Sequence, residues 1–165
     1  MKTAILYYSR TGNTREIAKI LEEKLKDNKA DVDLIEIEAE KKPGFFKAGR
    51  ASMKRIDLPI TNTDFNLKKY DMIIIGSPTW AGHPAPLYST FLKKAENIEG
   101  KKTAIFSIGA SPLEKRDRVV DFFKNDLESL GMSIPKATLA IQMDKGAIRD
   151  GEQHIDEFIG VVLKK

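Results

Sequence analysis

The chain has 165 residues, the length of one ordinary globular domain, and we expect residues 1–165 to form a single domain. It contains no cysteine, which excludes disulfides, thiolate metal sites and a cysteine nucleophile. Its net charge is +4, and no apolar stretch approaches the roughly 20 residues that span a bilayer. The apolar run at the N-terminus is also too short for a signal peptide. We therefore expect a soluble, cytoplasmic protein with no membrane partner.

Apolar runs and helical spacings alternate along the chain. The β-branched and apolar runs predict five strands, at residues 3–8, 32–37, 71–76, 103–108 and 136–142. Apolar residues at helical spacing predict helices at 14–26, 86–95, from Ser111 to about 130, and from near Asp150 onward. The third of these begins with a capping box of Ser111, Pro112 and Glu114. The irregular crossover at residues 38–70 is expected to hold a short helix near 44–55 and then an extended loop.

This alternation predicts a fold class. Strands that alternate with helices form a parallel sheet covered on both faces, so we expect an α/β, doubly wound, three-layer sandwich. Ligands of such sheets bind beyond the carboxyl ends of the strands. The segments that leave the first, third and fourth predicted strands are therefore the candidate sites.

The first of these segments is "SRTGNT", from Ser9 to Thr14. Hydroxyls, an amide and backbone N–H groups precede a helix, whose N-terminus favours an anion, so the segment predicts a phosphate site without a lysine. Its spacing is neither that of the nucleoside triphosphate loop nor that of the dinucleotide turn. The alternative is a capped turn without a ligand, because Ser, Thr and Asn favour helix caps.

The second segment is "GSPTWAGHPAP", residues 76–86. Pro78 and Pro84 predict a stiff loop, on which Trp80 can stack on a planar aromatic ligand. Gly82 permits a positive φ. The alternative is that Trp80 folds back as a lid on the core. We expect the following His83 to be a solvent-exposed loop residue, with contact to a ligand as the alternative.

The third segment is "SIGASP", residues 107–112, whose small residues let the backbone approach a ligand closely. Ser107 and Gly109 are the candidate contact positions, and Ser111 is expected to cap its helix. No group of His, Asp or Glu has the spacing of a metal site, and we interpret Asp31 and Asp33 as a solvated strand face.

A basic segment, "KKPGFFKAGRASMKR" at residues 41–55, has six cations and no acid. One interpretation is a docking surface for an acidic protein partner. The other is an amphipathic surface helix with Phe45 and Phe46 packed into the sheet. Because the chain shows no nucleic-acid-binding fold, we expect no nucleic-acid partner.

Two of these motifs together resemble a known family. "SRTGNT" after the first strand, and "YDMIIIGSPTWAG" at the third, are similar to the phosphate loop and the first ring-contacting loop of flavodoxins. The resemblance implies a five-stranded sheet of order 2-1-3-4-5 and non-covalent flavin mononucleotide (FMN), with Trp80 stacked on the ring and a loop carbonyl facing flavin N5. The implied phosphate ligands are Ser9, Thr11, Asn13 and Thr14, with the backbone of Arg10 and Gly12. The implied ring contacts are Pro78, Thr79, Trp80, Ala81 and Gly82, with Ser107 and Gly109 in the third loop.

The sequence departs from flavodoxins in two respects. Its third loop has no aromatic residue to cover the ring, and its surface is basic, whereas flavodoxins are strongly acidic. Because few carboxylates then lie near the flavin, we expect a second reduction potential less negative than that of acidic flavodoxins.

Several functions follow as expectations. The first is an FMN electron carrier that works with a redox partner protein or a small-molecule acceptor, as a monomer or homodimer. The second is an FMN-dependent NAD(P)H:quinone-type reductase. The third is a flavin-free binding module, which the intact phosphate loop disfavours. Signalling receivers share this topology but need acidic residues where this chain has Ser9 and Ser77.

Overall fold

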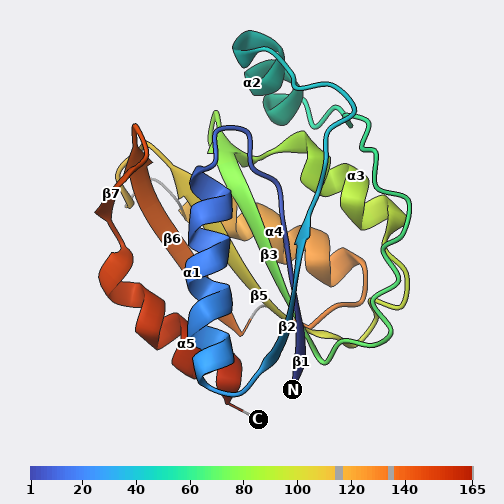
Figure 1. Ribbon diagram of the computed structural model, residues 1–165. Helices are drawn as coiled ribbons and strands as arrows, with labels where there is room; N and C mark the ends of the chain where they lie inside the picture. The colour runs from blue at the N-terminus through green and yellow to red at the C-terminus, as the bar shows by residue number, and fades with distance from the viewer. Residues whose placement is uncertain (114–116, 134–135, 165) are drawn as a thin grey trace.

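We describe the protein from a computed structural model, in which residues 1–113, 117–133 and 136–164 are described (Figure 1). Its strands are β1 (Lys2–Tyr7), β2 (Asp31–Glu36), β3 (Met72–Trp80), β4 (His83–Pro84), β5 (Lys102–Gly109), β6 (Ala137–Asp144) and β7 (Ala147–Asp150). Its helices are α1 (Asn13–Asp27), α2 (Phe45–Met53), α3 (Pro86–Lys94), α4 (Asp117–Ser129), the 3-10 helix η2 (Glu152–His154) and α5 (Ile155–Leu163).

The sheet has the order β2-β1-β3-β5-β6-β7, with β4 paired to β3. Its first five members in this order are parallel and have the predicted order, which confirms the doubly wound α/β fold. In the middle of the sheet, Ile5 lies between Leu34 of β2 and Ile74 of β3. The strand number is corrected from five to seven, because β4 and β7 add antiparallel pairings at the ends of β3 and β6.

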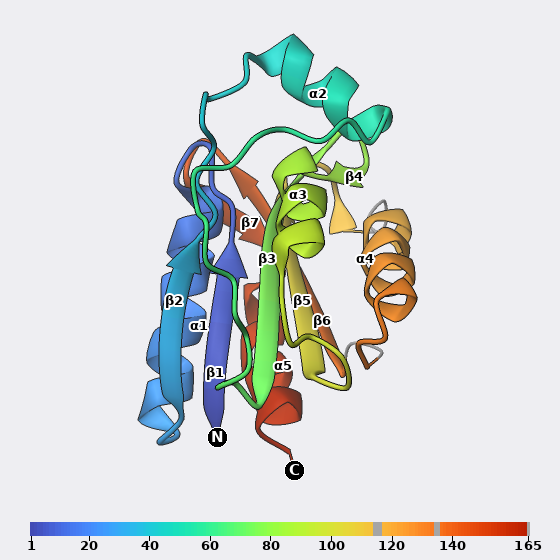
Figure 2. The same cartoon turned by 90° about the vertical axis from the view of Figure 1, so that its right-hand side faces the viewer.

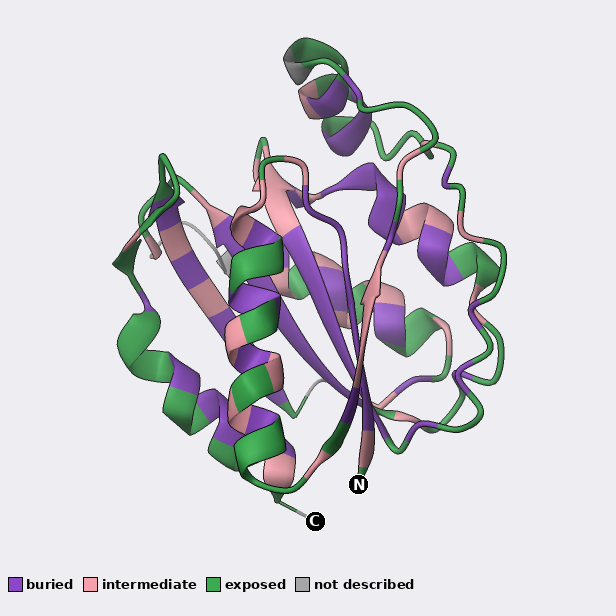
Figure 3. Cartoon of the chain, viewed as in Figure 1, coloured by how far each residue is buried: buried purple, intermediate pink, exposed green. Residues whose placement is uncertain are grey.

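Helices cover both faces of the sheet. One apolar cluster joins α1 and α5 to one face, and a second joins α3, α4 and the extended crossover to the other (Figures 1 and 2). The central strands are buried along most of their length (Figure 3). Their packing leaves no room at Gly76, where an added Cβ would lie 2.0 Å from the Phe106 ring.

The end of the chain contains a strand that was not predicted. β7 ends at Asp150 and Gly151 adopts a φ of 94°; the predicted last helix then begins as the 3-10 turn η2 at Glu152 and continues as α5 from Ile155. Residues 147–150 are mostly exposed, so they have no apolar alternation from which a strand can be predicted. The capping box predicted before α4 includes Glu114, which lies outside the described residues.

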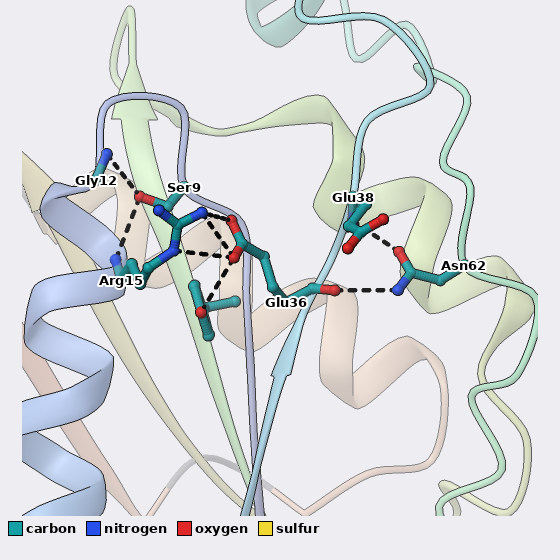
Figure 4. Close-up of polar contacts among 7 residues, drawn as sticks. Ser9, Gly12, Arg15, Glu36, Glu38 and Asn62 are labelled. Carbon is teal, nitrogen blue, oxygen red and sulfur yellow. Dashed lines mark hydrogen bonds and ion pairs between the residues drawn. The ribbon is translucent and has the colours of Figure 1, made fainter.

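The crossover contains the predicted short helix, here α2, followed by an extended chain. This chain is fastened to the end of β2: the Asn62 side-chain amide donates to the Glu36 carbonyl at 3.0 Å, and its oxygen accepts from the Glu38 N–H at 2.7 Å (Figure 4). Phe65 and Tyr70 then pack into the core. Both ends of the crossover are thereby anchored, and α2 stands beyond the carboxyl ends of the strands (Figures 1 and 2).

Candidate functional site

The segment between β1 and α1 is a tight loop built around Ser9. The Ser9 Oγ accepts hydrogen bonds from the backbone N–H groups of Gly12 and Arg15, both at 3.2 Å (Figure 4). Gly12 caps the helix with a φ of 98°, a conformation that suits glycine, and its missing side chain leaves open space. The Ser9 hydroxyl therefore holds the loop in shape, beyond any contact it makes with a ligand.

The first turn of α1 has free donors. Among the described residues, the backbone N–H groups of Asn13 and Thr14 have no hydrogen-bond acceptor, whereas Glu16 already donates to the Gly12 carbonyl at 2.9 Å. Unpaired amides at a helix N-terminus bear partial positive charge and point at one place. They suit a phosphate group, and no side-chain cap competes for them.

The arginine that directly follows this loop, Arg15, is paired with a carboxylate. The Nε and Nη2 groups of Arg15 donate to the two carboxylate oxygens of Glu36 at 2.6–3.0 Å (Figure 4). The Tyr7 hydroxyl donates to the same carboxylate at 3.3 Å. The pair ties the loop to the end of β2. A cleft of about 470 Å³ opens between the loop and the start of the crossover, with Arg10 and Lys42 in its lining. Clefts of this volume hold small ligands.

The predicted stiff loop after the third strand is instead a β-hairpin. Thr79 pairs with Pro84 and Trp80 with His83, so β3 runs through Trp80 and only two residues form the turn. Those two residues, Ala81 and Gly82, have φ values of 49° and 77°. Positive φ at both central positions is the type I′ arrangement, which matches the twist of the strands. Ala81 accepts this conformation without the freedom of glycine.

The hairpin and the phosphate loop touch through Trp80. The Trp80 ring meets Tyr8 edge to face, with centroids 5.7 Å apart, and the Arg10 guanidinium carbon lies 6.0 Å from the Trp80 ring centroid. Trp80 is half-buried and packs against the core cluster of the α3 and α4 face. It thus has part of the lid character that was the alternative prediction. The two segments with the flavodoxin-like motifs meet at one edge of the sheet.

Buried polar atoms without partners lie at the same edge. Thr79 Oγ1 and the Tyr8 hydroxyl are shielded from solvent and have no hydrogen-bond partner among the described residues. Burial raises the pKa of Tyr8, so its hydroxyl stays protonated and able to donate. Buried polar groups rarely stay unpaired without a reason, and a polar ligand at this edge is one such reason.

His83 does not lie where the sequence predicted. Its side chain is buried and stacks on Phe122 of α4, with ring centroids 4.5 Å apart and planes inclined by 36°. Burial, with smaller contributions from Arg118 and Arg55, lowers the pKa of His83. The solvent-exposed interpretation was wrong, because the covering ring belongs to a helix far along the chain.

The third predicted segment divides between strand and loop. Ser107 is buried within β5 beside Ser77 of β3, and Gly109 ends the strand. Just beyond it, the Gln142 side-chain amide donates to the Ala110 carbonyl at 3.0 Å. Ser107 therefore lies inside the sheet and not at the carboxyl end of its strand, where Gly109 lies.

The basic segment forms α2, but Phe46 does not pack into the sheet. Its side chain is 89% exposed, which contradicts that interpretation. Small residues face inward instead, since Ala48, Ala51 and Ser52 are buried. The Phe45 side chain lies outside the part of the chain that the structure describes, so only the Phe46 half of that interpretation is contradicted.

Comparison with known proteins decides the family. A family model described as NADPH-dependent FMN reductase matches residues 1–146. The chain belongs to this family. The match confirms FMN as the predicted cofactor, and the unpaired amides at α1 and the orphaned hydroxyls at the hairpin are compatible with it.

Relatives and solved structures agree on the fold. The chain is 28% identical over 145 residues to probable flavodoxin 1 of Bacillus subtilis, covering 86% of this chain and 78% of that one. It is 30% identical over 119 residues to protoporphyrinogen IX dehydrogenase [quinone] of Escherichia coli, covering 70% of this chain and 54% of that one. A flavoprotein of Lactobacillus acidophilus in complex with FMN superposes with a TM-score of 0.70 at 23% identity, covering 95% and 97% of the two chains. The predicted flavodoxin-like fold is confirmed.

Two kinds of feature are absent from the described residues. No helix among them has the length and apolar character needed to cross a membrane. Nor do residues 1–113, 117–133 and 136–164 contain three or more His, Asp or Glu side chains grouped so that they could hold a metal ion.

Proposed function

We propose that this protein is an electron carrier that holds FMN at the carboxyl edge of its sheet. Bound FMN supplies one- and two-electron chemistry, and the chain supplies binding and orientation. The observation that carries the proposal is the pair of unpaired amides, Asn13 and Thr14, at the start of α1 beside the Trp80 hairpin. The electrons would pass to and from a redox partner protein or a small-molecule acceptor.

The phosphate group is assigned to the loop of residues 9–14. The amides of Asn13 and Thr14 would donate to it, and the hydroxyls of Thr11 and Thr14 would add charge-assisted hydrogen bonds. The hydroxyl hydrogen of Ser9 would add another, because its oxygen already accepts from two amides of the loop. The phosphate charge would thus be balanced by a helix N-terminus instead of a lysine.

The isoalloxazine ring is assigned to the hairpin of residues 78–82, with Gly109 behind it. One face of Trp80 is occupied by the Arg10 guanidinium, so a stacked flavin would use the other face or displace Arg10. Thr79 Oγ1 would find a polar partner on the ring, which accounts for its burial without one.

A second candidate function is an FMN-dependent NAD(P)H:quinone-type reductase. The family model's description and the quinone-linked names of the E. coli relative and of the NAD(P)H dehydrogenase (quinone) of Brucella anthropi favour it. So does the third loop, which has no aromatic residue from Gly109 to Leu113 to cover the outer face of the ring. An open ring face admits a nicotinamide or a quinone.

Two measurements test these functions in order. Titration of the purified chain with FMN, followed by visible absorption, is expected to give saturable binding at one equivalent, and its absence after reconstitution would overturn both. The loaded protein is then mixed with NADH or NADPH and a water-soluble quinone. No turnover above that of free FMN is expected for a carrier, and saturable turnover would make the protein a reductase.

A further inference from the structure

Large apolar side chains are exposed mainly in one place. Four described residues of this kind are exposed, and three of them, Phe46, Met53 and Ile56, lie in or just after α2. Phe46 and Met53 are seven residues apart, so they share one face of the helix. The buried residues Ala48 and Ala51 lie on the opposite face. Among its described side chains, the helix is therefore apolar on both sides, with Phe46 and Met53 exposed on the outer one.

The exposed face is surrounded by cations without carboxylate partners. Lys41, Lys42, Lys47, Arg50 and Lys54 form no ion pair within the described residues. The next cation, Arg55, already binds Asp126 of α4. The first turn of α2 contains Lys47 and no acidic residue. A cation there is unfavourable for the helix macrodipole, so folding alone does not account for this charge pattern.

The position of α2 relates this surface to the candidate flavin site. The helix stands beyond the carboxyl ends of the strands, at the edge where the hairpin and the phosphate loop meet (Figures 1 and 2). It packs against β3, β4 and α3. A molecule seated on the outer face of α2 would lie beside the cofactor and would be well placed to exchange electrons with it.

We propose that the exposed face of α2 docks an acidic redox protein, whose carboxylates surround a small apolar patch. The proposal rests on the proposed FMN function. The docking surface consists of Phe46, Lys47, Arg50, Met53, Lys54 and Ile56. Opposite charge would steer the encounter, and the apolar side chains would hold the complex.

The arrangement of charge favours a protein over a lipid surface. Arg50 lies on the same helical face as Phe46 and Met53, between them, so it interrupts the apolar stripe. A bilayer would have to take this guanidinium among its acyl chains, which is costly. A protein can place a carboxylate opposite it and form two parallel hydrogen bonds.

The test uses the full chain loaded with FMN and a small, strongly acidic iron–sulfur protein as the probe. The reduced cluster gives up one electron and the oxidised flavin gains one, with protons taken from solvent. The second-order rate is followed by the loss of flavin absorption at several ionic strengths. We expect the rate to fall steeply as salt rises, because screening weakens the steering.

Matched variants locate the effect. The triple variant Lys47→Glu, Arg50→Glu, Lys54→Glu is expected to lower the rate at low salt by about tenfold or more. The control triple Lys19→Glu, Lys68→Glu, Lys102→Glu has the same net charge but changes exposed lysines elsewhere, and should lower it far less. Because charge reversal can unwind α2, a milder triple with Gln at the same three α2 positions should show the same ranking. The rate with a small uncharged quinone should be unchanged throughout.

The outcomes separate the two proposals. A protein that stays colourless after reconstitution with FMN defeats the proposed function. If the protein binds FMN fully but its electron-transfer rate does not change with salt, only the docking proposal is overturned. The same holds if the two charge-reversed triple variants lower that rate equally. Sedimentation of the parent with phosphatidylserine vesicles, lost in the α2 triple but not in the control, would also overturn it and assign the surface to membranes.

Discussion

Side chains are buried differently in the body of the sheet, meaning the middle of its strands and the helices packed on them, and at its carboxyl edge, where the strands end and the loops and α2 follow. In the body, apolar side chains such as Leu21 and Phe106 are fully buried in one of two clusters. At the edge, the buried Tyr8 hydroxyl and Thr79 Oγ1 have no hydrogen-bond partner among the described residues, as is also true of Thr3 Oγ1 in the body, but only at the edge is a large apolar side chain, Phe46, almost fully exposed. Sequences usually satisfy local and global requirements together, and departures concentrate where function needs them. The difference implies that substitutions in the body should change stability, whereas substitutions at the edge should change binding.

The largest effect is expected in the body. Leu21 has no exposed surface and packs in the cluster beneath α1, so Leu21→Ala should lower the free energy of unfolding by about 2–5 kcal/mol. Urea unfolding monitored by circular dichroism measures it. The exposed Glu23→Ala, on the same helix, is the control and should change stability little. Equal losses for the two variants would show that α1 is not packed as described.

The second effect is on ligand binding at the edge. Removing both hydroxyls with Thr11→Ala, Thr14→Ala should weaken FMN binding by about 2 kcal/mol, roughly 30-fold in Kd, because each lost charge-assisted bond costs about 1 kcal/mol or more. Fluorescence titration with FMN gives the affinity. The double change to serine keeps both hydroxyls and should restore most of it. Unchanged affinity in the alanine variant would make residues 9–14 a capped turn without a phosphate.

The third effect links the edge to pH. Burial lowers the pKa of His83 below its ordinary value of 6.5, with Arg118 and Arg55 acting in the same direction. Below that value the unfolded chain binds a proton that the folded chain resists, so stability should fall as pH falls. His83→Gln should remove the part that His83 contributes to the fall in the free energy of unfolding between about pH 7 and 5. Unfolding in urea across this range measures it, and an unchanged slope would contradict the burial of His83.

The control for that experiment is available in the chain. His154, the other histidine, is exposed at the end of η2. His154→Gln should keep the acid-side decline of the parent. If it removed the decline instead, the titrating group would lie outside the hairpin.

The sequence alone was sufficient to predict the elements in the body of the sheet, but not the contacts between segments at its carboxyl edge. The five parallel strands were predicted because each is marked by a run of adjacent apolar residues, such as residues 71–76, and such a run can be recognised from the local sequence. The two short strands were missed, since β4 has two residues and β7 is mostly exposed. The burial of His83 and the contact of Trp80 with Tyr8 were also missed, because each depends on a partner from a distant segment. The motifs nevertheless predicted that the two segments meet beyond the carboxyl ends of the strands, and they do meet there through Trp80.

The fourth prediction concerns the strained turn of the hairpin. Ala81 has a φ of 49°, and asparagine is the residue that type I′ turns favour before glycine. Ala81→Asn should therefore raise the free energy of unfolding by about 0.5 kcal/mol. Ala81→Val should lower it, because a β-branched side chain tolerates this conformation poorly. Thermal unfolding of both apoproteins measures the difference, and equal midpoints would argue against the two-residue turn.

The smallest effect on stability is expected at the most exposed apolar residue. Phe46 is 89% exposed, so Phe46→Ala should change the free energy of unfolding by less than about 0.5 kcal/mol. The same substitution at Phe65, which is 4% exposed, should cost about 3–5 kcal/mol. Yet Phe46→Ala should slow electron exchange with the acidic iron–sulfur protein several-fold, because an exposed ring in the docking surface would be covered by the partner. Urea unfolding and stopped-flow absorption on the same preparations compare the two. A large loss of stability would mean that the ring is buried after all, and an unchanged exchange rate would remove Phe46 from the docking surface.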